Sequence, residues 1–298
     1  MSIAASNTAA PRVWRDYDQE GLDRAYDQTV WAPYMADIQM RQAANSEAAR
    51  RRLGEPLRLA YGPSPIEGLD VFKARQPNAP VMVFIHGGAW LRGEAKNFAF
   101  PAEMFVDAGV NYVVADFAPV NNFGGDLSAM AAQVRRAIAF AYQNAAQFGG
   151  DASRLYLAGH SSGAHLAAVA LTIDWQAEFG LAPDFIKGAL LMSGMYDLKP
   201  VRLSKRSDYV KFSDAMEDAM SPQRHLDRLH TPITVTVGSK DSPEFIRQAR
   251  DFVAAVKAAG KPAELVEAPE YNHFDLSYSL GNPYGPNGRA ALTLMGLR

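Results

Sequence analysis

Two adjacent serines lie at a sharp change of pattern in the stretch "LYLAGHSSGAHLAAVAL", residues 155–171. Read as Gly-X-Ser-X-Gly, the segment from Gly159 to Gly163 has Ser161 at its centre, between an apolar run and an alanine-rich run. A tight strand-to-helix turn strains its central residue and needs small neighbours, which the two glycines supply. We therefore predict that Ser161 is a nucleophile above a helix N-terminus. A simple helix cap is the alternative interpretation.

A nucleophilic serine needs hydrogen-bond donors where negative charge develops, and two segments are candidates to supply them. The backbone N–H of Ser162, one residue past the nucleophile, is predicted to point into an oxyanion hole. The segment "HGGAW", residues 86–90, follows the apolar run "PVMVFI", where a second donor loop is expected. Glycines let the backbone approach a substrate closely, so Gly88 and Ala89 are the predicted donors. The alternative is an ordinary glycine turn with a packed tryptophan.

The base is sought among six histidines, because the expected chain order is serine, acid, histidine. His86 and His160 come too early, because they precede the serine. His165 lies on the helix after the serine, and His225 and His230 flank a segment that no strand precedes. His273, in "EYNHFD", follows the late apolar run "AELVEAP" and is the predicted base. A surface histidine is the alternative.

The acid that orients the base is predicted to be Asp241, in "VTVGSKDSPEF", because it lies between a strand and a helix. Glu244 is a second candidate, but an acid at a helix start is already explained by the helix dipole. Asp197, in "SGMYDL" one strand earlier, is the third.

Apolar runs that alternate with helical patterns must position these residues. Strands are predicted at 57–62, 69–74, 80–88, 110–117, 154–159, 186–194, 232–239 and 263–269, with helices at 127–149, from 162 onward and at 243–260. Strands alternating with helices in this way predict an α/β fold with a mainly parallel sheet covered on both faces. Residues 195–230 are longer than a simple connection, so we expect them to form a cap over the carboxyl edge of the sheet.

Composition narrows the function classes. The 298 residues are expected to form a single domain, 1–298. A net charge of −2 gives no reason to expect nucleic acid or a membrane as partner, and the absence of cysteine excludes disulfides and thiolate chemistry. The start lacks the apolar stretch of a signal peptide, so a cytoplasmic protein is expected. The histidines and acids show no metal-ligand spacing, and we predict neither a metal nor another cofactor.

With these motifs in hand, the chain resembles the α/β-hydrolase superfamily. Within it, the chain is similar to the kynurenine formamidase (arylformamidase) group, close to the hormone-sensitive-lipase-like esterases. The resemblance covers nearly the whole chain and rests on "HGGAW", "GHSSG", "SGMYDL", "DSPEFIRQ" and "NHFD", in that order. "SGMYDL" with "DSPEFIRQ" is the more particular pairing, since many esterases share the other three.

The resemblance implies an α/β-hydrolase fold with Ser161, Asp241 and His273 as the triad and Gly88, Ala89 and Ser162 as the oxyanion donors. It also implies that the N-terminal segment, about residues 12–55, folds over the site as part of the cap. One position departs from the pattern, because such formamidases typically carry a tyrosine where this chain has Ala89. The smaller side chain favours more room near the acyl group.

The expected function is that of a serine hydrolase that cleaves a small ester or N-formyl amide. The expected partner is therefore this small-molecule substrate. A general short-chain or aryl carboxylesterase is the alternative, and a non-catalytic small-molecule-binding protein is the alternative of another class. Trp90, Tyr196 and Phe274 lie next to the motifs and are predicted to line an aromatic pocket, with ordinary core packing as the alternative. A homodimer is left open.

Overall fold

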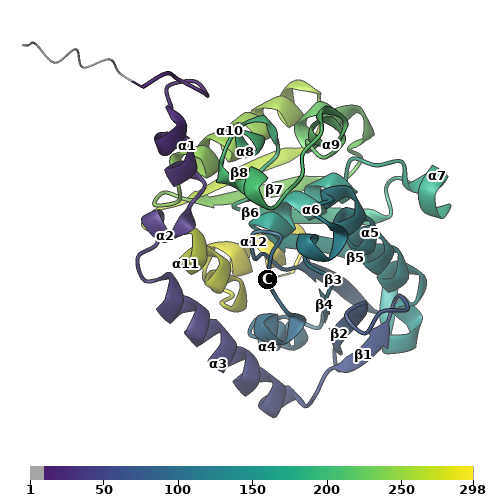
Figure 1. The fold of residues 1–298 in the computed structure, drawn as a ribbon. Coiled ribbons are helices and arrows are strands. Elements are labelled where there is room, and N and C mark those ends of the chain that lie inside the picture. The colour runs from purple at the N-terminus through teal and green to yellow at the C-terminus, as the bar shows by residue number, and fades with distance from the viewer. Residues whose placement is uncertain (1–9, 298) are drawn as a thin grey trace, which may run out of the picture.

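A computed structural model describes residues 10–297 and is organised around one eight-stranded sheet (Figure 1). The strands are β1 (Leu57–Ala60), β2 (Gly68–Phe72), β3 (Ala79–Ile85), β4 (Asn111–Ala115), β5 (Gly150–His160), β6 (Ile186–Met192), β7 (Ile233–Gly238) and β8 (Ala263–Ala268). They pair in the order β1-β2-β4-β3-β5-β6-β7-β8. The pairs β1–β2 and β2–β4 are antiparallel, and the others are parallel. The predicted mainly parallel sheet is confirmed.

Helices connect and cover the strands. They are α1 (Gln19–Ala25), α2 (Gln28–Trp31), α3 (Met35–Leu53), α4 (Ala102–Asp107), α5 (Leu127–Gln143), α6 (Ser162–Ala170), α7 (Trp175–Phe179), α8 (Lys199–Arg202), α9 (Asp214–Ala219), α10 (Pro243–Ala258), α11 (His273–Tyr278) and α12 (Pro286–Leu294). Short 3₁₀ turns occupy Ala95–Phe98, Val120–Phe123, Ala145–Phe148, Lys205–Asp208, Pro222–Arg224, Leu226–Arg228 and Ser279–Gly281. The helix predicted at 127–149 ends at Gln143, and a 3₁₀ turn carries the chain to Gly149, which has a left-handed conformation.

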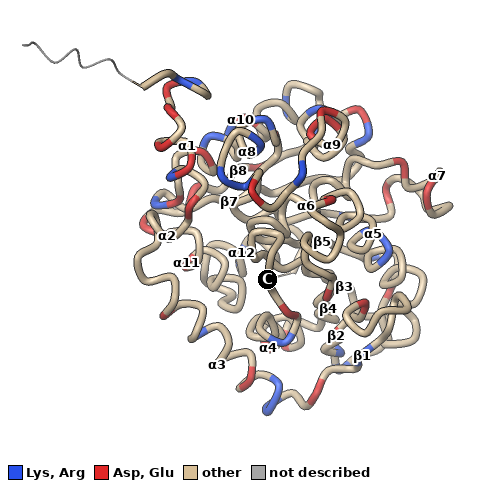
Figure 2. The backbone as a smooth tube through the Cα atoms, in the orientation of Figure 1, with Lys and Arg blue, Asp and Glu red and all other residues tan. Residues whose placement is uncertain are grey.

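The sheet has a separate hydrophobic core on each face, because successive side chains of a strand point to opposite sides. In β3, Val81, Val83 and Ile85 belong to the core that also contains apolar residues of α5, α6 and α10. Met82 and Phe84 belong to the core on the other face, with residues of α4 and α12. Helices therefore cover both faces, as predicted. Charged residues lie mainly on the outer helices and loops (Figure 2), and β3, β4 and β7 carry none.

Parallel strands bring the loops that follow them to one edge of the sheet. The "HGGAW" loop follows β3, the serine turn follows β5, and the Asp241 loop follows β7. The N-terminal helices lie at the same side of the molecule, where α3 runs past α11 and α4 (Figure 1). Within residues 10–297, no helix has both the length and the apolar character that a membrane span requires.

Candidate active site

The turn at Ser161 has the strained geometry that its sequence predicts. Ser161 has φ 56° and ψ −123°, a left-handed conformation that is unfavourable for a residue with a side chain. The flanking glycines are required by close contacts: a Cβ atom on Gly159 would lie 2.5 Å from the Gly163 carbonyl oxygen, and one on Gly163 would lie 2.1 Å from the Ile85 carbonyl oxygen. The Ser161 amide donates to the Met192 carbonyl at 2.8 Å, which fixes the turn to β6.

The "HGGAW" loop is equally constrained. Gly88, Ala89 and Trp90 all have positive φ values, of 134°, 57° and 64°. A Cβ atom on Gly88 would lie 1.8 Å from the Arg92 carbonyl oxygen, so only glycine fits there. Across the described residues, the amides of Gly88, Ala89 and Ser162 donate to no protein acceptor. These three N–H groups are therefore unoccupied by protein acceptors, and their role as oxyanion donors stays a prediction.

The Ser162 hydroxyl connects this loop to the serine turn. Its Oγ accepts a hydrogen bond from the Trp90 amide at 3.2 Å, and both residues are buried. The side chain of Ser162 is thus structural, while its backbone N–H stays free at the start of α6. The sequence identified the second of these features and missed the first.

His273 and Asp241 form a buried pair. His273 Nδ1 lies 3.0 Å from Asp241 Oδ2 and 3.2 Å from Oδ1, and the two residues are 1% and 2% exposed. The Ser242 amide donates to Asp241 Oδ1 at 2.8 Å, and the Phe245 ring packs edge-on against the imidazole with centroids 5.0 Å apart. The histidine orientation is therefore set from two sides.

Ser161 and His273 line one cavity, although no hydrogen bond joins the Ser161 hydroxyl to His273 among residues 10–297. Such contacts often tighten only when substrate is bound. The structure thus brings the three predicted catalytic side chains to one site, and their roles stay a prediction.

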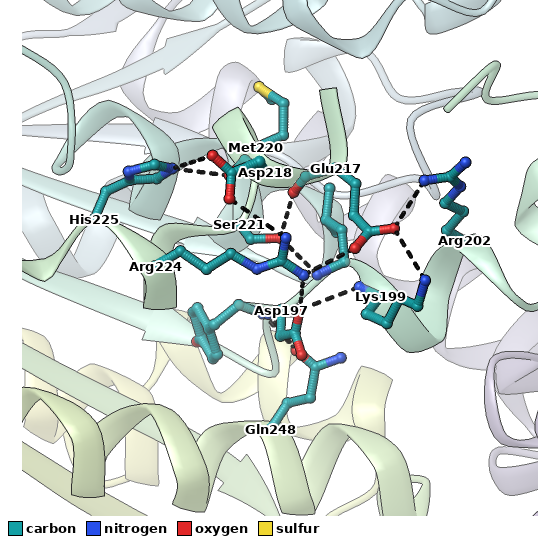
Figure 3. Close-up of polar contacts among 12 residues, drawn as sticks. Asp197, Lys199, Arg202, Glu217, Asp218, Met220, Ser221, Arg224, His225 and Gln248 are labelled. Carbon is teal, nitrogen blue, oxygen red and sulfur yellow. Dashed lines mark hydrogen bonds and ion pairs between the residues drawn. The ribbon is translucent and has the colours of Figure 1, made fainter. Parts of the chain in front are cut away.

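The two alternative acids are engaged elsewhere. Figure 3 shows Asp197 bound to Arg224 and to the Lys199 amide, at 2.9 and 3.1 Å. Asp197 is therefore held in an ion-pair network that includes residues of α8 and α9. Glu244 is buried and accepts two hydrogen bonds from Arg247, at 2.9 and 2.7 Å. Neither carboxylate is paired with His273.

Three other histidines are buried near the site and have structural contacts. His160 Nε2 donates to the His273 carbonyl at 3.0 Å, and burial followed by the charge of His273 holds its pKa well below the ordinary value. Burial lowers the pKa of His86, whose ring is stacked against Phe117. Burial also lowers the pKa of His165 to about 4. These imidazoles are therefore neutral at pH 7.

The cavity in front of Ser161 has a volume of about 1120 Å³. Its walls come from the loop after β3, from α1 to α3 and from the segment around Arg206. Both segments predicted as a cap, about 12–55 and 195–230, therefore contribute to the cavity. Phe274 lines the cavity and packs edge-on against His273, with centroids 5.1 Å apart.

Trp90 and Tyr196 do not line this cavity, which corrects the expectation that they bind substrate. Both are 0% exposed. The Trp90 ring packs edge-on against His165 at 5.2 Å, and the Tyr196 ring stacks on Phe252 at 4.1 Å. Both residues are close to the motifs in sequence, but each ring is packed in the core and not toward the cavity.

Two buried residues on the cavity wall, Tyr26 and Arg206, were not predicted from the sequence. The Tyr26 hydroxyl donates to Glu244 at 3.1 Å and accepts from Gln248 at 2.8 Å, and Ser242 Oγ donates to the Ala25 carbonyl at 2.6 Å. These bonds fix the N-terminal segment to the start of α10, directly after Asp241. More than 200 residues separate the partners, and no local pattern signals such contacts.

Comparisons with known proteins relate the chain to a hydrolase family. The BD-FAE family model matches residues 69–186. The chain is 31% identical to a kynurenine formamidase from Danio rerio over 88% of this chain and 92% of that protein. It is 31% identical to the esterase LipC from Mycobacterium tuberculosis over 76% of this chain and 61% of that protein.

A solved structure from Silicibacter sp. TM1040 superposes with a TM-score of 0.80 and 25% identity, covering 92% of this chain and 98% of that one. The α/β-hydrolase fold expected from the motifs is thereby confirmed, and so is a hydrolase. The chain belongs to the α/β-hydrolase family that includes the kynurenine formamidases.

Proposed function

We propose that this hydrolase cleaves small ester or N-formyl amide bonds through an acyl-enzyme on Ser161, with His273 as base and Asp241 as its orienting acid. The observation that carries the proposal is the buried Asp241–His273 pair, whose histidine lines the same cavity as the strained Ser161. A buried carboxylate bound to imidazole Nδ1 leaves Nε2 free to take a proton, which is the arrangement that serine hydrolysis needs.

In the first half of the reaction, Ser161 Oγ attacks the carbonyl carbon while His273 Nε2 accepts the hydroxyl proton. The carbonyl oxygen becomes negative and accepts hydrogen bonds from the free amides of Gly88, Ala89 and Ser162. His273 then donates its proton to the leaving alcohol or amine, and Asp241 stabilises the imidazolium between the two transfers.

In the second half, water replaces the leaving group. His273 removes a proton from the water, which attacks the acyl carbon, and the same three amides stabilise the second oxyanion. Breakdown of that intermediate returns the proton to Ser161 and releases the carboxylic acid. Tyr26 and Phe274 extend the cavity wall beside these groups and supply apolar surface for an aryl substituent.

Arylformamidase-like activity, with an N-formyl amide as substrate, is the leading candidate. The relative from Danio rerio is named kynurenine formamidase and matches over most of both chains. Ala89 favours a second candidate, a general short-chain or aryl carboxylesterase. Ala89 lines the cavity, and a small side chain beside the oxyanion amides leaves room for acyl groups larger than formyl. The similarity to the esterase LipC supports the same candidate.

A non-catalytic binding protein on this fold is the candidate of another class. It is disfavoured because such a protein has no need for the Asp241–His273 pair. Burying the Asp241 carboxylate costs free energy, and a binding protein gains nothing from it. Covalent labelling discriminates the two classes directly, since a binding protein does not react with an active-site phosphonate.

The test is turnover of N-formyl-kynurenine beside p-nitrophenyl acetate and butyrate, with Ser161→Ala as control. We expect hydrolysis of at least one substrate by the wild-type protein, covalent labelling of Ser161, and a loss of kcat of about 10⁴-fold or more in the variant. Full activity in Ser161→Ala would exclude the proposal. Preference for N-formyl-kynurenine supports the formamidase, and preference for the butyrate ester supports the second candidate.

A further inference from the structure

A buried arginine lies on the wall of the catalytic cavity without an acidic partner. Arg206 is 7% exposed and follows α8 in the segment that covers the site. Its guanidinium donates to two neutral groups, the Tyr209 hydroxyl at 2.8 Å and the Tyr26 carbonyl at 3.2 Å. Its Nε atom is buried and has no hydrogen-bond partner in the described part of the chain.

The other partly buried arginines are all paired with carboxylates. Arg247 contacts Glu244 and Asp251, Arg202 contacts Asp214 and Glu217, Arg135 contacts Glu178, and Arg50 contacts Glu55 and Asp70. Arg206 therefore differs from them, because residues 10–297 place no carboxylate within ion-pair distance of it. A guanidinium has five N–H donors, and only two are used here.

The surroundings of Arg206 offset only part of the cost of burying its charge. The guanidinium carbon lies 5.4 Å from the centroid of the Trp90 ring, a cation–π contact. Its two hydrogen-bond partners are the Tyr26 carbonyl and the Tyr209 hydroxyl, which carry no formal charge. An isolated charge out of water is unfavourable unless a counter-charge approaches it, and a carboxylate is the group that a guanidinium binds with two hydrogen bonds.

The remaining charges on the cavity wall do not supply that counter-charge. The acids Glu20, Asp23, Asp27 and Glu94 and the cations Arg24, Arg92 and Lys205 also line it, and none of these seven is buried. Asp23 accepts from the Lys205 amide, Asp27 from the Thr29 amide, and Glu94 is paired with Lys96. Exposed charges at a rim are screened by water and salt, whereas the buried Arg206 is not.

We infer that Arg206 binds a carboxylate of the substrate, so that the preferred ester or amide carries an anionic group in addition to the bond that is cleaved. This inference rests on the proposed function for the location of the cleaved bond. Arg206 joins the segment after α8, the N-terminal segment through Tyr26 and the oxyanion loop through Trp90. A carboxylate bound there is enclosed in the same cavity as Ser161.

The experiment compares each carboxylate substrate with a neutral analogue of the same shape. One pair varies the leaving group, 3-acetoxybenzoate against 3-acetoxybenzamide. The other varies the acyl group, monophenyl glutarate against phenyl 5-methylhexanoate. We expect the wild-type protein to show a kcat/KM at least tenfold higher for the carboxylate in one pair. A ratio of one or less in both pairs overturns the inference without any variant being made.

Substitution of Arg206 separates substrate binding from support of the fold. Arg206→Gln is expected to bring the ratio of kcat/KM for the carboxylate to that for its neutral analogue down to about one, and Arg206→Lys should keep part of the preference. Arg24→Gln, which removes an exposed cation on the same wall, is the matched control and should keep the full preference. Equal losses for both substrates in Arg206→Gln would show that Arg206 only supports Trp90.

Binding to Ser161→Ala tests the inference without catalysis. Calorimetric titration should give a dissociation constant at least tenfold lower for 3-acetoxybenzoate than for the benzamide, and Arg206→Gln in the same background should remove the difference. Equal binding contradicts a role for Arg206 in carboxylate recognition. If Ser161→Ala keeps its activity, the proposed nucleophile is wrong, and the titrations still decide whether Arg206 binds a carboxylate.

Discussion

The Ser162 hydroxyl and the Trp90 amide are joined by a hydrogen bond of 3.2 Å, which ties the loop after β3 to the turn after β5. Each of these segments carries amides without a protein acceptor among the described residues, Gly88 and Ala89 in the first and Ser162 in the second, and these are the proposed oxyanion donors. Backbone bonds hold each segment, and the Ser162 hydroxyl adds a direct side-chain link between them. Because oxyanion stabilisation is sensitive to the distance from donor to oxygen, we expect the Ser162 side chain to position the proposed donors.

We predict that Ser162→Ala lowers kcat about tenfold and leaves KM nearly unchanged, because the variant keeps the Ser162 amide but leaves the buried Trp90 N–H without a partner. Steady-state kinetics with p-nitrophenyl acetate measure both constants. Ser193→Ala is a matched control, since Ser193 is a buried serine after β6 whose hydroxyl has no hydrogen-bond partner among the described residues. An unchanged kcat in Ser162→Ala would mean that the loop keeps its place without this bond.

For the acid, we expect Asp241→Asn to lower kcat by about 10³- to 10⁴-fold while phosphonate labelling of Ser161 still proceeds slowly, because an amide favours the wrong imidazole tautomer. Asp197→Asn is the matched control and should leave kcat within about threefold, since its bond to Arg224 is an ordinary partly exposed ion pair. The assignment fails if the two variants behave in the opposite way.

Much of this site is predictable because its residues sit at the ends of strands. Ser161 and Asp241 follow β5 and β7, and His273 follows β8, in the chain order expected for serine, acid and histidine. Glycine spacing also carries information, since Gly88 and Gly163 are each required by a backbone contact that no other residue allows.

The cavity wall is not predictable in the same way. Tyr26 reaches Glu244 across 218 positions of sequence, and Arg206 reaches Tyr26 across 180. Trp90 was predicted to line the cavity, but its ring is buried in the core. Its backbone has a positive φ of 64°. Side-chain direction in a loop depends on such dihedrals, which periodicity does not encode.

The buried histidines make stability depend on pH. Burial lowers the pKa of His165 to about 4 from an ordinary value of 6.5, so the unfolded chain binds a proton more readily than the folded one. The stabilisation is therefore complete above pH 6.5 and is lost as the pH falls toward 4, by about 3 kcal/mol for this residue.

Urea unfolding between pH 4 and 7 measures this loss, and His165→Gln should reduce the slope of unfolding free energy against pH in that window. His86 and His160 remain in the variant, so some slope persists. An identical slope in both proteins would contradict the buried neutral state of His165.

Gly88→Ala is expected to lower kcat by about 10²-fold, because the added Cβ meets the Arg92 carbonyl at 1.8 Å and displaces the donor amides. Gly124→Ala is the control for a positive φ alone, since Gly124 has φ 62° and open space around it. It should cost about 1 kcal/mol of stability with kcat unchanged. Kinetics and thermal melting of both variants decide the matter, and equal kcat values would show that the loop tolerates the displacement.

Ala89 is expected to set the size of the acyl group. It lines the cavity beside the free amides, so a larger side chain there should occupy the space that accepts acyl groups beyond formyl. Each methylene that fits contributes about 1–3 kcal/mol of discrimination, so we expect graded differences: the wild-type protein should hydrolyse aryl esters from acetyl through butyryl well and long-chain esters poorly. Ala89→Tyr should then raise the ratio of kcat/KM for phenyl formate to that for phenyl butyrate by at least tenfold. Ala89→Ser, which adds little volume at the same left-handed position, should leave the ratio nearly unchanged. If the tyrosine variant keeps the wild-type ratio, the side chain at position 89 points away from the acyl group and another wall of the cavity determines its size.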